Sequence, residues 1–125
     1  PDALLLLTHT ENLTHAVMTG ALADLWMSRA DAEAKGWSED LARRYLRLLE
    51  PVRPLCVPPA QIVSVLGRRD VVLPFAGGRK LVEAWCVPHD NVFIWDRGHF
   101  SVPMTMAGNH APLRRFAAIM SALRR

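Results

Sequence analysis

Three short runs of apolar residues, each followed by polar residues, constrain the fold of this chain most. The runs cover residues 3–8, 62–66 and 92–95, and polar positions hardly interrupt them. A strand with one face in water alternates apolar and polar residues, whereas a strand of a parallel sheet is covered on both faces and is apolar almost throughout. The runs therefore predict three parallel strands.

The segments between the runs carry apolar residues at helical spacing. We expect helices over about residues 13–34, 38–50, 78–86 and 112–123, and a loop over residues 96–110. Gly36 is expected to end the first helix and Ser38 to cap the second. Buried stripes are expected at Leu41, Tyr45, Leu48 and Leu49 in the second helix, and at Leu113, Phe116, Ala117, Met120 and Leu123 in the last. Strands that alternate with helices predict an α/β fold.

The order of these elements predicts a single domain segment of 125 residues in four parts. Residues 1–11 form a core strand and its loop, and residues 12–50 form a helical insertion. Residues 51–61, which hold four prolines, form a connector, and residues 62–125 complete the α/β core. Three strands leave two apolar edges, and the chain begins at Pro1 almost within a strand. We therefore expect partner strands from an N-terminal half of a longer protein, from a second chain, or from self-association.

Charge and cysteine content exclude several classes of protein. The net charge is +3, and the arginines form no continuous basic stripe with interleaved aromatic residues, so no nucleic-acid partner is expected. No apolar run approaches the roughly 18 residues that a membrane span needs. Cys56 and Cys86 form no Cys-x-x-Cys pair, and we expect both side chains to be buried in the protein core. Free cysteines are typical of a reducing compartment, so we expect the protein to be cytoplasmic.

Ionisable residues follow all three predicted strands. His9 and Glu11 follow the first strand, Asp70 follows the second, and Asp96 and His99 follow the third. Reactive groups of open parallel sheets gather at the carboxyl ends of the strands. The sequence therefore predicts a site at this edge of the sheet.

Asp70 and His99 are the strongest candidates for that site. A turn aspartate or a loop histidine alone is more often an ordinary cap or surface residue. Their separation, however, allows one helix and a return to the neighbouring strand. An imidazole can take a proton from a hydroxyl group and return it to a leaving group. A carboxylate on Nδ1 fixes the tautomer that this task needs. Together the two residues predict two members of a catalytic triad.

The region from Ile62 to Ser101 resembles the C-terminal end of the α/β-hydrolase fold family. The resemblance rests on Gly-x-x-Asp-x-x-x-Pro over residues 67–74 and on Gly-His-Phe-Ser over residues 98–101. It implies that Asp70 is the acid and that His99 is the general base and acid. It also implies that residues 12–50 form a cap-like insertion and that residues 113–123 form the terminal helix. It further implies a serine-type, esterase-like or lipase-like hydrolase that acts on a small ester or related acyl substrate.

The nucleophile of such an enzyme is not found in these residues. No Gly-x-Ser-x-Gly occurs, and the family places its nucleophile before the acid and the histidine. The nucleophile and the oxyanion hole are therefore expected upstream, and this chain alone is expected to be inactive. A non-catalytic binding or assembly module, an acyltransferase and a dehalogenase on the same fold stay open as alternatives.

Other residues carry weaker hypotheses. Glu11 is the alternative acid, and Asp96 is expected to form a loop hydrogen bond. Ser101 lies too close to His99 in sequence to be expected as its nucleophile. The remaining histidines show no metal-ligand spacing, so neither a metal nor a cofactor is expected; they are His9, His15, His89 and His110.

Overall fold

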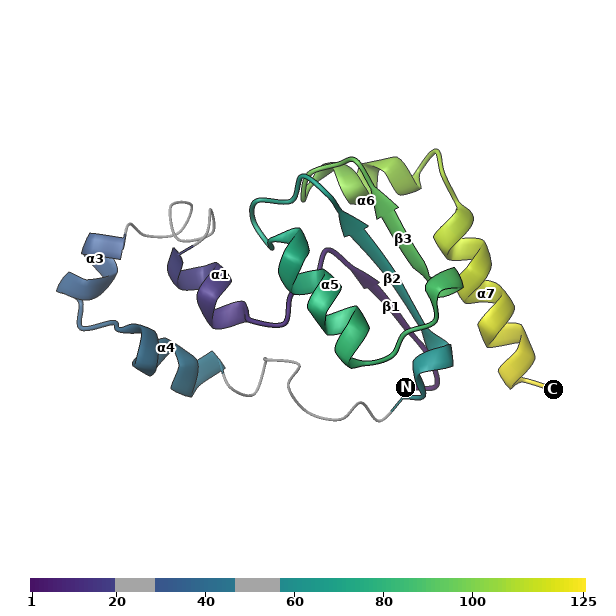
Figure 1. The fold of residues 1–125 in the computed structure, drawn as a ribbon, viewed down its shortest axis with the longest axis horizontal. Helices are drawn as coiled ribbons and strands as arrows, with labels where there is room; N and C mark the ends of the chain where they lie inside the picture. The colour runs from purple at the N-terminus through teal and green to yellow at the C-terminus, as the bar shows by residue number, and fades with distance from the viewer. Residues whose placement is uncertain (20–28, 47–56) are drawn as a thin grey trace.

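The computed structural model of this chain describes residues 1–19, 29–46 and 57–125. In these residues three parallel strands form one sheet in the order β1 (Leu4–Leu7), β2 (Ile62–Gly67) and β3 (Val92–Trp95) (Figure 1). The predicted α/β class with a parallel sheet is therefore confirmed.

The central position of β2 explains its unbroken apolar run. Leu4 of β1 pairs in register with Ile62, and Ser64 pairs with Val92 of β3, so β2 has a neighbour on both sides. Every residue of β2 is buried, whereas β1 is half-buried throughout and Ile94 of β3 is exposed. In the described part of the chain β1 and β3 are the two edges of the sheet.

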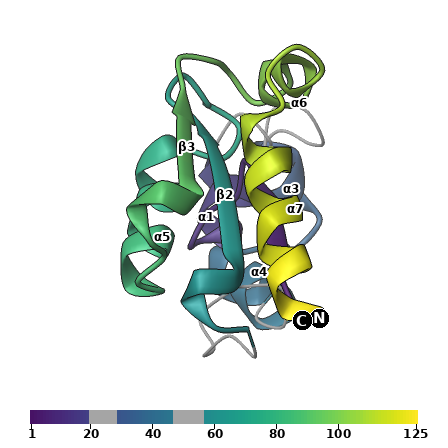
Figure 2. The same ribbon diagram turned by 90° about the vertical axis from the view of Figure 1, so that its right-hand side faces the viewer.

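Helices cover both faces of the sheet. Figure 2 shows α5 (Phe75–Ala84) and α7 (Ala111–Leu123) on opposite faces, with α6 (Ser101–Met106) near the carboxyl ends of the strands. The main apolar cluster consists of Val57, Ile62, Leu66, Val82 and Val87, with Leu4, Leu6, Phe75, Trp85 and Val92 packed against it. This cluster fixes α5 on the sheet by removing apolar surface from water.

Helix α7 begins as expected, with a proline in its first turn. Its predicted stripe is only partly buried: Phe116 and Met120 are half-buried, but Leu113, Ala117 and Leu123 are exposed. The helix packs mainly on β2, so it covers a narrower strip than its apolar spacing predicted.

The helical insertion lies to one side of the sheet and comprises α1 (Leu13–Thr19), α3 (Arg29–Ala34) and α4 (Glu39–Leu46) (Figure 1). Helices α1 and α4 pack together, and the small residues Ala16 and Ala42 are buried. Gly36 ends α3 with a φ of 83°, and the Ser38 hydroxyl accepts a hydrogen bond from the Leu41 N–H at 3.2 Å. Both predicted helix boundaries are therefore confirmed.

Several predictions about residue environments are wrong. Tyr45 is exposed, because Ala42 is the residue of α4 that is buried. Cys86 is exposed with a φ of 53°, because the chain reverses there after α5 and buries Val87 instead. The expected loop over residues 96–110 contains α6, which buries Val102 and Met106.

Helix α5 begins three residues earlier than expected and ends before Cys86. The predictions that concern residues 20–28, Leu48, Leu49, Cys56 and most of the connector lie outside the described residues. Within the ranges that the structure describes, no helix combines the length and the apolar character that a membrane crossing requires.

Candidate active site

The carboxyl ends of β2 and β3 lie side by side, and each continues into a residue of the predicted pair. His99 Nδ1 lies 2.9 Å from Asp70 Oδ2, across 29 residues of sequence. The Asp70 side chain is 1% exposed and that of His99 is 21% exposed. The structure therefore brings the acid and the histidine into one hydrogen bond, with the carboxylate shielded from water.

Asp70 uses both of its carboxylate oxygens. Oδ1 accepts hydrogen bonds from the backbone N–H groups of Val72 and Leu73, each at 2.9 Å, and Oδ2 faces His99. The first two bonds form the tight turn typical of aspartate, which leads the chain into Pro74 and α5. The turn aims the second oxygen at the histidine loop.

This arrangement determines which nitrogen of His99 can act as a base. A carboxylate only accepts hydrogen bonds, so Nδ1 must carry a proton, and the neutral ring then has its lone pair on Nε2. Nε2 has no hydrogen-bond partner among the residues that the structure describes. The pair can therefore accept a proton at Nε2 while Asp70 stabilises the resulting imidazolium.

The loop that carries His99 is closed by its own side chains. The Ser101 hydroxyl accepts a hydrogen bond from the Gly98 N–H and donates one to the Gly98 carbonyl, both at 3.0 Å. The Phe100 ring meets the His99 ring edge to face, with 5.1 Å between centroids. The Ser101 hydroxyl is thus engaged with Gly98 rather than with His99.

Gly67 belongs to the Gly-x-x-Asp motif, but its role in the site was not predicted from the sequence. A Cβ atom at this position would lie 2.5 Å from the Arg97 carbonyl oxygen and 3.0 Å from Cγ2 of Val102. Only glycine lets the histidine loop cross the end of β2 this closely. The available signal was a glycine that ends an otherwise apolar strand.

The other acids of this edge have different partners. Glu11, the alternative acid, pairs with Lys80 of α5 at 3.2 Å and forms no ion pair with His99. Asp96 forms two hydrogen bonds with Arg69, at 2.8 and 2.6 Å. The predicted loop contact of Asp96 is therefore present, and Asp70 is the acid that meets the histidine.

His9 does not lie in the site that the sequence predicted. Its Nε2 lies 2.8 Å from the Ser64 hydroxyl in the middle of β2, and its ring stacks on Trp85 at 6.5 Å between centroids. Its Nδ1 is buried and has no hydrogen-bond partner within residues 1–19, 29–46 and 57–125. Desolvation by burial lowers the pKa of His9 from 6.5 to about 4. The ring is therefore a neutral part of the packing between the sheet and α5.

The described residues include no cluster of three His, Cys, Asp or Glu side chains that could hold a metal ion. His89 is exposed beside Asp90, with 4.0 Å between Nδ1 and Oδ1. His110 is exposed at the start of α7, and the backbone N–H of His15 donates to Asn12.

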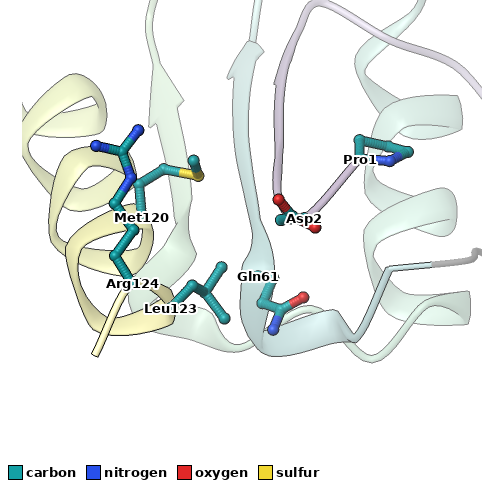
Figure 3. A pocket seen from close by; sticks show the side chains of 6 residues that line it. All are labelled: Pro1, Asp2, Gln61, Met120, Leu123 and Arg124. Carbon is teal, nitrogen blue, oxygen red and sulfur yellow. The ribbon is translucent and has the colours of Figure 1, made fainter.

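Two hollows on the surface flank the core without touching the pair. One of about 360 Å³ lies between the loop after β1 and the start of α5, and both Glu11 and Lys80 line it. Another of about 420 Å³ lies at the opposite end of the sheet, where the chain enters β1 and β2 (Figure 3). The residues that line the second one are Pro1, Asp2, Gln61, Met120, Leu123 and Arg124.

Comparisons with models of known families, with curated proteins and with solved structures find no match to this chain. The functional argument therefore rests on the geometry of Asp70 and His99 and on their sequence context.

Proposed function

We propose that this chain supplies the acid and the general base of a serine-type α/β-hydrolase that acts on an ester or a related acyl substrate. The observation that carries the proposal is the 2.9 Å hydrogen bond between a buried Asp70 carboxylate and Nδ1 of His99. Both residues follow the carboxyl ends of neighbouring parallel strands, where α/β folds gather their reactive groups.

A purely structural role for Asp70 accounts for only one of its two carboxylate oxygens. The turn over Val72 and Leu73 needs one carboxylate oxygen, and Asp70 gives it Oδ1. Oδ2 is not needed for the turn, yet it lies within hydrogen-bond distance of an imidazole whose other nitrogen has no partner in the described chain. This contact between Oδ2 and His99 favours a role of Asp70 in proton transfer by His99 over a role in closing the turn alone.

In the proposed reaction, His99 Nε2 takes the proton of a serine hydroxyl while that oxygen attacks the acyl carbon. Asp70 holds the ring in the required tautomer and stabilises the imidazolium. His99 then returns the proton to the leaving oxygen, so the alcohol departs and an acyl-enzyme forms. A water molecule then gives a proton to His99 and attacks the acyl carbon. His99 returns this proton to the serine oxygen, and the carboxylic acid product departs.

The serine and the oxyanion hole belong to polypeptide outside these 125 residues in this proposal. The sequence contains no Gly-x-Ser-x-Gly, and the Ser101 hydroxyl is bonded to Gly98. β1 pairs with β2 on one side, and in the described residues its other edge has no neighbouring strand. A parallel strand paired there would extend the same sheet, with its carboxyl end at the edge that holds the pair.

The test measures ester turnover and labelling by a fluorophosphonate, which reacts with activated serines. It uses the longest polypeptide that the reading frame encodes around these residues. His99→Ala is expected to lower turnover by about 10³-fold or more and to abolish labelling. His89→Ala and Asp90→Asn are the matched controls, because both side chains are exposed, and they are expected to leave turnover unchanged. Unchanged turnover in His99→Ala would contradict the proposal.

A non-catalytic binding or assembly module is the second candidate, and the lack of a nucleophile motif favours it. It predicts no labelling in the longest polypeptide and an unchanged fold in His99→Ala. An acyltransferase differs from the hydrolase in the molecule that accepts the acyl group. A dehalogenase differs from it in the nucleophilic residue. Mass spectrometry of the covalent intermediate separates these, because it identifies the nucleophilic residue and the group attached to it.

A further inference from the structure

Arg69 and Asp96 join the two segments that carry the acid and the histidine. Arg69 Nε donates to Asp96 Oδ1 at 2.8 Å, and Nη2 donates to Oδ2 at 2.6 Å. Arg69 immediately precedes Asp70, and Asp96 lies three residues before His99. The two parallel bonds therefore join the same two chain segments as the bond between Asp70 and His99.

Backbone contacts join the same two segments. The Arg68 N–H donates to the Trp95 carbonyl at 2.8 Å, and the Arg69 N–H donates to the Arg97 carbonyl at 3.0 Å. These bonds continue the β2–β3 pairing beyond the last paired residues of the strands. They set the distance between the segments, but His99 lies beyond them. The bond between Arg69 and Asp96 adds a side-chain contact between the same two segments.

The Arg69–Asp96 bond has little value for stability alone. The two side chains are 73% and 58% exposed, and exposed ion pairs contribute little because water and salt screen them. A bidentate guanidinium–carboxylate pair does, however, fix the relative orientation of its two groups. The bond is thus suited to setting geometry rather than to holding the fold together.

We propose that Arg69 and Asp96 are positioning residues, whose bidentate bond holds the His99 loop in register with Asp70. The effect of the Arg69–Asp96 bond on catalysis rests on the proposed function. Its effect on the Asp70–His99 bond does not depend on that function. When the Arg69–Asp96 bond is lost, the loop samples positions in which His99 Nδ1 leaves Asp70 Oδ2. Ring orientation, and not the stability of the fold, then changes.

Arg68 offers a matched control for Arg69. It lies in the same turn and carries the same charge, but its guanidinium lies over the Phe75 ring, 5.8 Å from the centroid. Arg68→Gln therefore removes the same charge from the same turn and leaves the bond to Asp96 in place. Arg69→Lys keeps the charge but cannot form two parallel bonds to one carboxylate.

The first measurement is the ¹H and ¹⁵N NMR signal of His99 Nδ1–H in the 125-residue chain. A proton held by a buried carboxylate exchanges slowly with water, so this signal reports the Asp70–His99 bond directly. Arg69→Gln, Asp96→Asn and Arg69→Lys are each expected to speed its exchange by about tenfold or more. Arg68→Gln is expected to leave it unchanged. Molar salt, which screens the exposed pair, is expected to speed exchange in the unmodified chain and to add nothing in Asp96→Asn.

The outcomes separate this inference from the proposed function. An unchanged Nδ1–H signal in both Arg69→Gln and Asp96→Asn would overturn the positioning role, whatever the turnover of the full polypeptide. An unchanged signal in Arg69→Lys alone would overturn the need for two parallel bonds. A signal that depends on Arg69 in a protein without fluorophosphonate labelling would support the positioning role and contradict the hydrolase.

Turnover gives the second measurement. In the longest polypeptide, Arg69→Gln is expected to lower kcat about tenfold or more while KM stays the same, because only the orientation of the base changes. A rise in KM with unchanged kcat would overturn the role, because it would indicate a contact with substrate. Loss of folding is monitored by urea unfolding, in which Arg69→Gln and Arg68→Gln are expected to give the same midpoint.

Discussion

Asp70 Oδ2 meets His99 Nδ1 at 2.9 Å, while Oδ1 of the same carboxylate holds the turn over Val72 and Leu73. One buried side chain therefore serves both the local backbone and the histidine of a neighbouring loop. The two duties use different oxygens, so substitutions of Asp70 can separate them.

The first prediction compares Asp70→Asn with Asp70→Ala. Asparagine keeps an oxygen for the two backbone N–H groups but presents an N–H₂ group to His99, which favours the wrong tautomer. It is expected to lower kcat about 10⁴-fold in the full polypeptide with a small effect on unfolding. Alanine leaves the N–H groups of Val72, which is buried, and of Leu73, which is half-buried, without their acceptor, and it is expected to cost about 2–4 kcal/mol of unfolding free energy. Urea denaturation of the chain measures the difference, and equal stabilities would contradict the assignment of Oδ1 to the turn.

The second prediction concerns the close approach at Gly67. A Cβ atom there would meet the Arg97 carbonyl oxygen, which is backbone and cannot swing away. Gly67→Ala is expected to lower the free energy of unfolding by about 1–3 kcal/mol and to weaken the His99 Nδ1–H signal. Gly108→Ala is the control, because its nearest contact would be an ordinary 3.9 Å from the Thr105 carbonyl oxygen. A Gly67→Ala protein with wild-type stability would show that the loop does not lie this close to β2.

The third prediction is a pH dependence of stability that arises from His9. Burial lowers its pKa from 6.5 to about 4, so the unfolded chain binds a proton at this residue more readily than the folded chain does. Stability from this residue is therefore complete above about pH 6.5 and is lost as the pH falls towards 4. At pH 5 the loss is expected to be about 2 kcal/mol relative to pH 7.5.

Urea unfolding at pH 7.5 and pH 5 measures this effect. His9→Gln, which does not titrate, is expected to remove about 2 kcal/mol of the difference between the two pH values. His89→Gln is the control, because His89 is exposed, and it is expected to keep the full difference. Equal pH sensitivity in both variants would show that His9 is not the group responsible.

The fourth prediction concerns the direction of the backbone groups of β1. The Thr8 N–H donates to the Val65 carbonyl at 2.9 Å, so in this parallel pair the N–H of Leu6 faces β2 and that of Leu5 faces the open edge. Leu6→Pro is therefore expected to cost about 2 kcal/mol more unfolding free energy than Leu5→Pro. Leu5→Pro is also expected to reduce any association of the chain through this edge, measured by sedimentation velocity. Similar stabilities of the two variants would contradict the register.

The parallel strands and the meeting of Asp70 with His99 were predictable from sequence for one physical reason. Apolar runs locate parallel strands, and parallel strands bring their carboxyl ends, and the residues that follow them, to one edge. Asp70 and Pro74 are residues typical of turns, so they also predicted that the chain turns directly after the second strand. The roles of Gly67 and Arg69 were not predictable, because each depends on which residues of two separate loops face one another.

The fates of His9 and Cys86 could not be predicted from the sequence for a different reason. Both follow a regular element, where the direction of one side chain depends on a single backbone torsion. Thr8, just before His9, has a φ of 45°, and Cys86 has a φ of 53°. These left-handed positions direct His9 back towards Ser64 and leave Cys86 in solvent. The spacing of residues along the chain does not predict the backbone torsions at these two positions.

The double use of Asp70 has a consequence for how related sequences are to be interpreted. A buried aspartate that closes a turn is retained by selection for folding, whether or not the protein catalyses anything. The His99 side chain takes no part in the bonds to Val72 and Leu73, so its replacement would leave the turn intact. Among descendants of one ancestor, loss of the histidine with retention of the aspartate would therefore mark lineages that abandoned the chemistry and kept the scaffold.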